Sequence, residues 1–334
     1  WIMAYTTIDN PELYFQVKLY TGNGSTQSLT LDGDENMQPD FVWFKARSGD
    51  AASHTLFDSV RGAQKRLNAD SGNAESTLTT GLSSFDSDGF SIGSNADMNT
   101  DGVTHVAWCW KESATAGFDI VEADGTGSAR TQAHSLSAVP EWIFVKELDN
   151  AGSWYTYTAM MGNTKAMFLN ATNAVSADSS GYWNDTTPTS SVFSLGTDGG
   201  VNQSSTGYVF YLWRSIQGFS KFGKYTGNGN ADGTYVHLGF RPAFLITKQT
   251  DGVDDWQLVD NKRDGYNLTE KFIKPNSTNT ETTHANNIRV DFLSNGFKCY
   301  GANSVFNGSG NSYIYMAFAE APFVNSNGVP CNAR

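Results

Sequence analysis

Three similar stretches of sequence read His105-Val106-Ala107-Trp108-Cys109-Trp110, Tyr208-Val209-Phe210-Tyr211-Leu212-Trp213 and Tyr313-Ile314-Tyr315-Met316-Ala317-Phe318. Their first residues lie 103 and 105 positions apart, which marks an internal repeat on the scale of a domain. Each stretch is rich in aromatic and β-branched residues and is bounded by Gly, Ser or Asn, a composition that favours a buried strand over a helix. The chain therefore predicts three copies of one β unit.

Other landmarks recur in the same order around this closing stretch. Each copy has a Gly-rich turn, an apolar strand opened by a proline, a half-buried middle strand and a short strand that contains Phe. A proline suits the first position of a strand, where no ladder hydrogen bond is yet required. The prolines are Pro39, Pro140 and Pro242, and their strands end at Lys45, Lys146 and Lys248, which we expect to be solvated. The common order predicts one strand order in every copy, with the first and last strands as neighbours.

Many short strands with Gly-rich turns predict an all-β fold of three tandem β-sandwich domains, of a jelly-roll or lectin-like kind. Trp1 and Ile2 stand ahead of Met3 as either an upstream extension or an artefact. The expected bounds are an N-terminal lead-in at 1–13, repeats at 14–112, 113–216 and 217–323, and a C-terminal tail at 324–334.

The composition is acidic, polar and aromatic. The formal net charge is −12, and only 17% of residues are charged while 13% are aromatic. This is typical of extracellular or virion β-proteins, and equally of any all-β protein with many turns. The acidic balance argues against a nucleic-acid partner and against binding to an anionic membrane. The sequence contains no run of 18 apolar residues, so it predicts no membrane-spanning segment. Cys109, Cys299 and Cys331 do not repeat between copies, so we expect free thiols.

No motif predicts a catalytic residue or a cofactor. The five histidines lack metal-ligand spacing, and neither a G-x-S-x-G elbow nor a P-loop is present. Asp86 and Asp88, in Asp86-Ser87-Asp88-Gly89, are weak metal candidates because they resemble the opening of a calcium loop, but the further ligands are missing. A turn explains them better. A glycosidase needs two carboxyl groups a few ångströms apart. Among 34 acidic residues some pair will meet this condition by chance, and no feature of the sequence distinguishes one pair.

One polar loop of the second copy contains Tyr182-Trp183-Asn184-Asp185. These four residues are weak candidates for a ligand site. An exposed Trp ring can stack on the apolar face of a sugar while the neighbouring amide and carboxylate bind hydroxyl groups. The alternative is that Trp183 folds back and covers the edge of its sandwich.

Several segments together resemble a known family. They are Tyr20-Thr21-Gly22-Asn23-Gly24, Asp58-Ser59-Val60-Arg61-Gly62, Ser84-Phe85-Asp86-Ser87-Asp88-Gly89-Phe90 and Ala319-Glu320-Ala321-Pro322-Phe323. They are similar to a tandem domain of unknown function found in virion proteins of marine bacteriophages, among them tail-fibre and tail-tip proteins. The resemblance covers residues 3–334. The family has no assigned catalytic residues, so none is carried over.

The resemblance implies a virion structural protein of the tail-fibre or tail-spike type, assembled in the host cytoplasm. Its expected partners are other virion proteins and a host-surface receptor, with a glycan as the expected receptor class. Divergent loops on repeated scaffolds favour the same function. The alternatives are a glycan-degrading tailspike enzyme and a capsid decoration or fibre protein without receptor binding. We expect a homo-oligomer, a trimer, with a pseudo-threefold monomer as its competitor.

Overall fold

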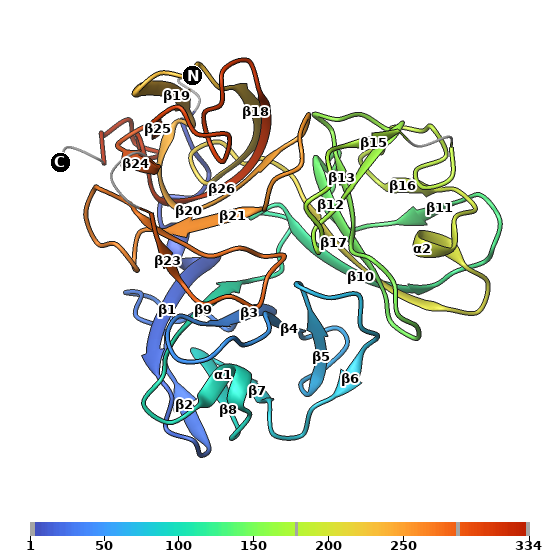
Figure 1. The fold of residues 1–334 in the computed structure, drawn as a ribbon. Helices are drawn as coiled ribbons and strands as arrows, with labels where there is room; N and C mark the ends of the chain where they lie inside the picture. Colours follow the sequence, from blue (N-terminus) through green and yellow to red (C-terminus); the bar gives the residue numbers. More distant parts are fainter. Residues whose placement is uncertain (1–3, 178–179, 285–287, 332–334) are drawn as a thin grey trace.

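The computed structural model describes residues 4–177, 180–284 and 288–331 and is shown in Figure 1. Strands dominate it, which confirms the all-β class. Its described helices are η1 (Pro11–Leu13), α1 (Ala96–Asn99) and α2 (Gly199–Asn202). None of them is long and apolar enough to cross a membrane. Trp1, Ile2 and Met3 lie outside the described residues.

Each repeat contributes one run of strands. Repeat 1 holds β1 (Phe15–Thr21), β2 (Gln27–Leu29), β3 (Phe41–Ala46), β4 (Thr55–Asp58), β5 (Lys65–Asn68), β6 (Ser76–Thr77), β7 (Leu82–Asp86), β8 (Gly89–Ile92) and β9 (Thr104–Trp110). Repeat 2 holds β10 (Phe118–Asp124), β11 (Arg130–Ala133), β12 (Trp142–Glu147), β13 (Tyr155–Thr158), β14 (Lys165–Phe168), β15 (Ser176–Ala177), β16 (Val192–Leu195) and β17 (Gly207–Trp213). Repeat 3 holds β18 (Ser220–Thr226), β19 (Asp232–His237), β20 (Phe240–Gln249), β21 (Gln257–Asp260), β22 (Lys271–Phe272), β23 (Thr282–Thr283), β24 (Arg289–Leu293), β25 (Gly296–Tyr300) and β26 (Ser312–Pro322).

The large sheets share one strand order, as the repeated landmarks predict. The orders are β1-β9-β3-β4-β5-β6, β10-β17-β12-β13-β14-β15 and β18-β26-β20-β21, and all of their pairings are antiparallel. The first and last strands of each repeat are neighbours. A small sheet made of β2-β8-β7, β11-β16 or β19-β25-β24 belongs to each repeat. The expected repeat bounds fall in the short links between β9 and β10 and between β17 and β18.

The closing strands are buried on both faces, which explains their nearly continuous apolar sequence. In β9, Ala107 and Cys109 point into the core of repeat 1, between its large and small sheets. Trp108 and Trp110 alternate with them and enter a different cluster, the central core, to which all three repeats contribute. Each repeat therefore has its own core and also covers part of a common one.

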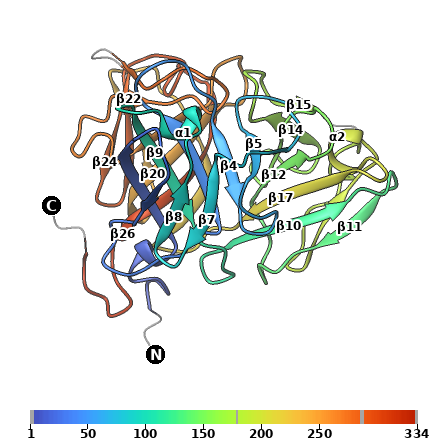
Figure 2. The same ribbon diagram turned by 90° about the horizontal axis from the view of Figure 1, so that it is seen from below.

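Aromatic contacts across the central core join the repeats directly. The ring centroids of Phe41 in repeat 1 and Tyr211 in repeat 2 are 4.7 Å apart. Those of Trp142 in repeat 2 and Trp256 in repeat 3 are 6.2 Å apart. Phe15 of repeat 1 stacks at 5.2 Å on Phe318 of repeat 3. Figure 1 shows the resulting three lobes around one centre. Figure 2 shows the repeat 2 lobe beside β4 and β5 of repeat 1.

The lead-in and the tail close onto repeat 3. The Tyr5 hydroxyl donates to Gly239 O (2.8 Å), and the Thr6 hydroxyl donates to Gln217 O (2.8 Å). The Ser326 amide donates to the Asp9 carboxylate (2.7 Å), so the first and last described segments are joined. The chain ends therefore reinforce the contact between repeats 1 and 3.

Candidate functional site

The most distinctive polar contacts lie where two repeats meet, at places named here junction 1–2, junction 2–3 and junction 3–1. One ring N–H of each repeat donates to a main-chain carbonyl of another repeat, always at the same position of the repeat. The three donors form a closed ring of contacts, which gives the body pseudo-threefold symmetry. The bonds run from Trp154 Nε1 to Asn68 O (2.8 Å), from Trp256 Nε1 to Phe168 O (2.9 Å) and from His54 Nε2 to Lys274 O (3.0 Å).

Main-chain hydrogen bonds reinforce the same ring. In junction 1–2 the Gly152 amide donates to Gly72 O (2.8 Å), and the Glu75 amide donates to Leu148 O (2.8 Å). The equivalent bonds link Asp254 to Thr172 and Val175 to Thr250 in junction 2–3, and Ala52 to Thr278 and Glu281 to Arg47 in junction 3–1. Because main-chain bonds need no particular side chain, they survive where the repeats have diverged.

In this closed set of contacts, His54 occupies the position that Trp154 and Trp256 hold in the other repeats. Its imidazole is neutral. The Trp43 indole donates to His54 Nδ1 (2.7 Å), so Nε2 carries the proton that bonds Lys274 O. Burial, followed by the nearby Lys45 charge, lowers the pKa of His54 well below its ordinary value. Both ring nitrogens are occupied, so this histidine serves as a structural contact. His105 is likewise fully buried, and its ring stacks on that of Tyr20 with 5.2 Å between ring centroids.

The lysines that end the proline-opened strands are fully buried, so the expectation of solvated strand ends is wrong. Lys45 Nζ donates to Ala52 O (2.7 Å) and, across junction 3–1, to Thr278 O (2.9 Å). Lys146 and Lys248 donate to the main-chain carbonyls of Glu147 (2.8 Å) and Gln249 (2.7 Å). The sequence does not show this burial because loops of the repeats cover the strand end. Burial lowers the pKa of all three ammonium groups to about 8.

These lysines predict a stability that rises with pH. Between about pH 8 and 10.5 the unfolded chain holds protons that the folded lysines have lost, so raising the pH there favours the folded state. Replacing Lys146 by methionine should reduce the slope of unfolding free energy against pH by about 1 kcal/mol per pH unit, close to the limit for one proton. Urea unfolding from pH 8 to 9.5 measures the slope. Buried thiols and tyrosines titrate alike in both proteins, so an unchanged slope would contradict a deprotonating Lys146.

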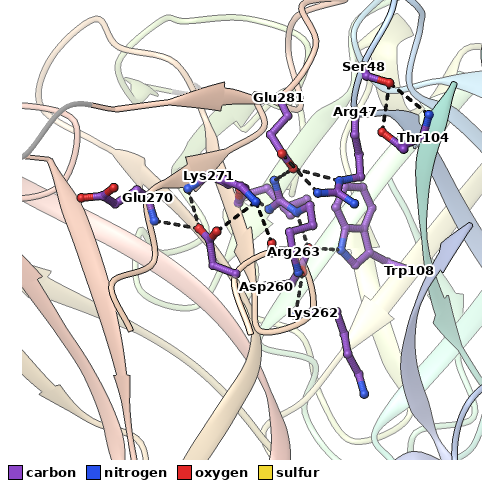
Figure 3. Close-up of polar contacts among 12 residues, drawn as sticks. Arg47, Ser48, Thr104, Trp108, Asp260, Lys262, Arg263, Glu270, Lys271 and Glu281 are labelled. Atoms are coloured by element: carbon purple, nitrogen blue, oxygen red, sulfur yellow. Dashed lines mark hydrogen bonds and ion pairs between the residues drawn. The ribbon is translucent and has the colours of Figure 1, made fainter. Parts of the chain in front are cut away.

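Junction 3–1 contains a buried ion-pair network, drawn in Figure 3. Arg263 Nε bonds Asp260 Oδ2 (2.6 Å), and Arg263 Nη1 bonds Glu281 Oε2 (3.3 Å). The Trp108 indole of repeat 1 donates to the same Asp260 oxygen (3.0 Å). Arg47 of repeat 1 also bonds Glu281 (3.0 Å), so the network crosses the junction twice. The side chains of Asp260 and Arg263 are 0% exposed.

Junction 1–2 repeats this network with other partners. Arg61 Nε bonds Asp58 Oδ2 (2.5 Å), and Arg61 Nη1 bonds Glu75 Oε2 (3.0 Å). The Tyr211 hydroxyl of repeat 2 replaces the indole and donates to Asp58 Oδ2 (2.6 Å). Both carboxylates are therefore held by partners, with the Asp58 side chain 0% exposed and the Glu75 side chain 15% exposed. Such networks fix the geometry of the junctions.

Among the described residues, junction 2–3 has no such network and contains a hollow instead. Thr158 and Met161 of repeat 2 occupy the positions of the Asp and Arg, and Val175 that of the Glu. Met316 of repeat 3 stands where the indole or phenol donor is found elsewhere. The hollow has a volume of about 550 Å³, and its lining includes Met161, Val175, Lys165 and Lys224. At this junction the replaced side chains leave room for a ligand.

The four weak candidates for a ligand site in the loop of repeat 2 lie in different surroundings. Trp183 is 2% exposed and packs in the core of repeat 2, and its indole donates to Lys165 O (2.9 Å). Its faces are covered by this chain, so the ring covers its sandwich, as the alternative stated. Tyr182 is half-buried at 5.0 Å from Tyr155, while Asn184 and Asp185 are exposed. The four residues do not form one exposed platform.

The weak metal candidates lie in a hairpin turn between β7 and β8. Asp86 accepts hydrogen bonds from the hydroxyls of Ser84 and Ser91, both at 2.7 Å. Asp88 accepts from the Met37 amide (3.2 Å), so the two carboxylates serve different partners. Within the described ranges, no group of three or more His, Cys, Asp or Glu residues could hold a metal ion. The described cysteines are free, with Cys109 and Cys299 buried and Cys331 exposed.

One set of equivalent residues, a buried asparagine in each repeat, was not identified from the sequence. A fully buried asparagine, six positions before each closing stretch, bonds the Gly-rich turn of its own repeat. Its amide oxygen accepts from the turn, and its amide nitrogen donates to main-chain carbonyls. In repeat 1 the Asn23 amide donates to Asn99 (2.9 Å), with Thr126 to Asn202 and Asn228 to Asn307 as the equivalents. The repeat spacing of 103 and 105 residues was the signal that could have found them.

The comparisons with known proteins place the chain in a family. The chain belongs to the family described as Domain of unknown function (DUF7483), whose model matches residues 10–322. This single match covers all three repeats together with the junctions between them. No curated protein matches the chain.

Proposed function

We propose that this member of the DUF7483 family is a virion structural protein of the phage tail-fibre or tail-spike type that recognises a host-surface glycan. The observation that carries the proposal is the closed ring of contacts at the junctions, which joins three loop-bearing sandwiches into one body. Binding residues commonly lie on loops that a rigid scaffold positions. The sequence resemblance to phage virion proteins supplies the biological context.

The Gly-rich turns show how such a scaffold can hold polar loops ready for a ligand. A Cβ at Gly22 would lie 2.2 Å from Thr100 O, so this turn packs directly on the main chain after α1. The buried Asn99 fixes the same turn, while Asn23 at its tip is exposed. Three such tips give the body repeated polar surfaces whose geometry is set before a ligand arrives, which reduces the ordering cost of binding.

The rival class is a glycan-degrading tailspike enzyme. A glycosidase of the usual kind needs two carboxyl groups beside the scissile bond, one of them accessible to water. The most deeply buried carboxylates at the junctions, Asp58 and Asp260, are bound by Arg61 and Arg263. We therefore propose binding without catalysis. The third option is a capsid decoration or fibre protein without a receptor. It would have the same fold as the proposed tail protein and would differ in its place on the virion.

Two measurements test this proposal together. Immunogold labelling of intact particles should place the chain on the tail, and the purified protein should bind host cells without shortening their surface polysaccharide. Labelling on the capsid, or absence of cell binding, would overturn the recognition function. Release of shortened chains would overturn the assignment as a non-enzyme and favour the tailspike enzyme.

Assembly with further copies is also proposed. The three repeats already form a pseudo-threefold body within one chain, so a homotrimer would assemble through their outer surfaces. A solution mass of three chains would support the homotrimer. A mass of 36.3 kDa would show that the chain itself supplies the threefold arrangement.

A further inference from the structure

Junction 2–3 differs from its two counterparts by a coordinated change of charge. At junction 1–2, Lys65 is paired with Glu75 (2.9 Å), and Glu122 of repeat 2 lies near the same network. At junction 2–3, Val175 replaces the glutamate, so Lys165 has lost the acidic partner of its counterpart. Lys224 of repeat 3 occupies the position of Glu122. One junction of an acidic chain has therefore become cationic.

Neither lysine of this junction forms an ion pair in the described part of the chain. Both Lys165 and Lys224 are exposed and line the hollow. The acidic residue of the lining, Asp251, already has partners: its carboxylate accepts from the Ser312 amide (2.8 Å) and from the Gln249 side chain (3.0 Å). Two ammonium groups thus line a common space, and no carboxylate among the described residues forms an ion pair with either of them.

The wall of the hollow is apolar where the ion-pair networks lie in the other junctions. Met160, Met161 and Val175 are half-buried against the central core, and Ile314 is buried beside them. Methionine side chains adapt to irregular ligands because they are unbranched and polarisable. A volume of about 550 Å³ lies in the range of small-molecule sites. The site therefore combines two cations, an apolar wall and the polar side chains of Thr250 and Ser312.

We infer that this hollow binds a carboxylate-bearing sugar residue of the host glycan, an inference that rests on the proposed function. The carboxylate of a uronic-acid unit matches the two ammonium groups, which gain charge-assisted hydrogen bonds. The apolar face of the pyranose ring packs on Met161 and Val175. Hydroxyl groups of the sugar bond Thr250 and Ser312 at the rim. The other two junctions, where arginine networks occupy this space, do not bind it.

The test uses the full chain and a hexasaccharide of galacturonic acid as the probe. Calorimetric titration of the wild type should show binding that weakens with added salt, whereas a neutral hexasaccharide of glucose should bind at least tenfold more weakly. Lys165→Gln and Lys224→Gln should each lower the affinity about tenfold, which corresponds to the loss of one charge-assisted bond. Val175→Glu restores the partner that Lys65 has in repeat 1, so it should abolish binding. Lys65→Gln and Lys271→Gln, at the equivalent positions of the other repeats, are matched controls and should bind as the wild type does.

The outcomes separate this site from the proposed function. If the protein binds host cells but Lys165→Gln and Lys224→Gln bind the acidic probe like the wild type, the inference is wrong and glycan recognition stands. Equal binding of the neutral probe would also overturn it, as would binding of a fatty acid in place of the sugar. If the wild type binds neither host cells nor any polysaccharide, the proposed function itself fails. The substituted lysines are exposed, so the variants should unfold at the wild-type temperature, and this measurement shows that lost binding reflects the site.

Discussion

Replacing Asp260 by alanine should lower the free energy of unfolding by about 3–5 kcal/mol, because it leaves a buried charge without its partner. The Arg263 side chain is 0% exposed and bonds Asp260 through Nε (2.6 Å). The Trp108 indole of repeat 1 would lose its acceptor as well. The damage therefore falls on the junction between repeats 3 and 1 and on the central core behind it. Urea unfolding followed by tryptophan fluorescence measures the loss.

The chain itself provides the control for this prediction. Repeat 2 places Thr158 and Met161 where repeat 3 has Asp260 and Arg263. The double variant Asp260→Thr and Arg263→Met copies that solution and should recover most of the lost stability, since it removes both buried charges together and leaves neither without its partner. Glu281 keeps Arg47 as a partner in this variant. A loss below about 1 kcal/mol for Asp260→Ala, or a double variant as unstable as the single one, would contradict a buried charge as the cause.

The features that could be predicted from the sequence depend on local rules. Alternating aromatic residues identify strands, and Gly-rich turns mark where strands end. Pro39 and Pro140 stand just ahead of β3 and β12 as expected, whereas Pro242 lies inside β20 at a shift of register, so the expectation that a proline opens the strand is wrong in repeat 3. Because three copies carry these signals in one order, they also predict the pairing of β1 with β9, β10 with β17 and β18 with β26. The bounds of the repeats follow from the same landmarks.

The central core could not be predicted because it depends on contacts between repeats. In β9 both faces are apolar, with Trp108 and Trp110 on one and Ala107 and Cys109 on the other. That pattern indicates burial on two sides, but it does not name the second partner. The fully buried Lys45 shows the same difficulty, because a loop of repeat 3 supplies one of its acceptors.

The candidate site was missed for a related reason. The sequence suggests Trp183 as a ligand contact because it is an aromatic residue in a polar loop. The loop folds back onto repeat 2, however, and buries the indole ring. Junction 2–3 joins residues more than a hundred positions apart, such as Met161 and Met316. Comparison of the repeats reveals that Met161 departs from Arg61 and Arg263. Only the arrangement in space shows that this departure opens a hollow between two lysines.

The central claim is that the three repeats form one cooperative unit around a common core, and differential scanning calorimetry of the intact chain tests it most directly. A chain of 334 residues that unfolds as one unit should absorb about 230 kcal/mol near 60 °C in a single transition. The account predicts a van't Hoff enthalpy equal to this calorimetric enthalpy. Three independently unfolding repeats would instead give a van't Hoff enthalpy of about one third of the calorimetric value, or separate transitions, and either result would contradict the common core.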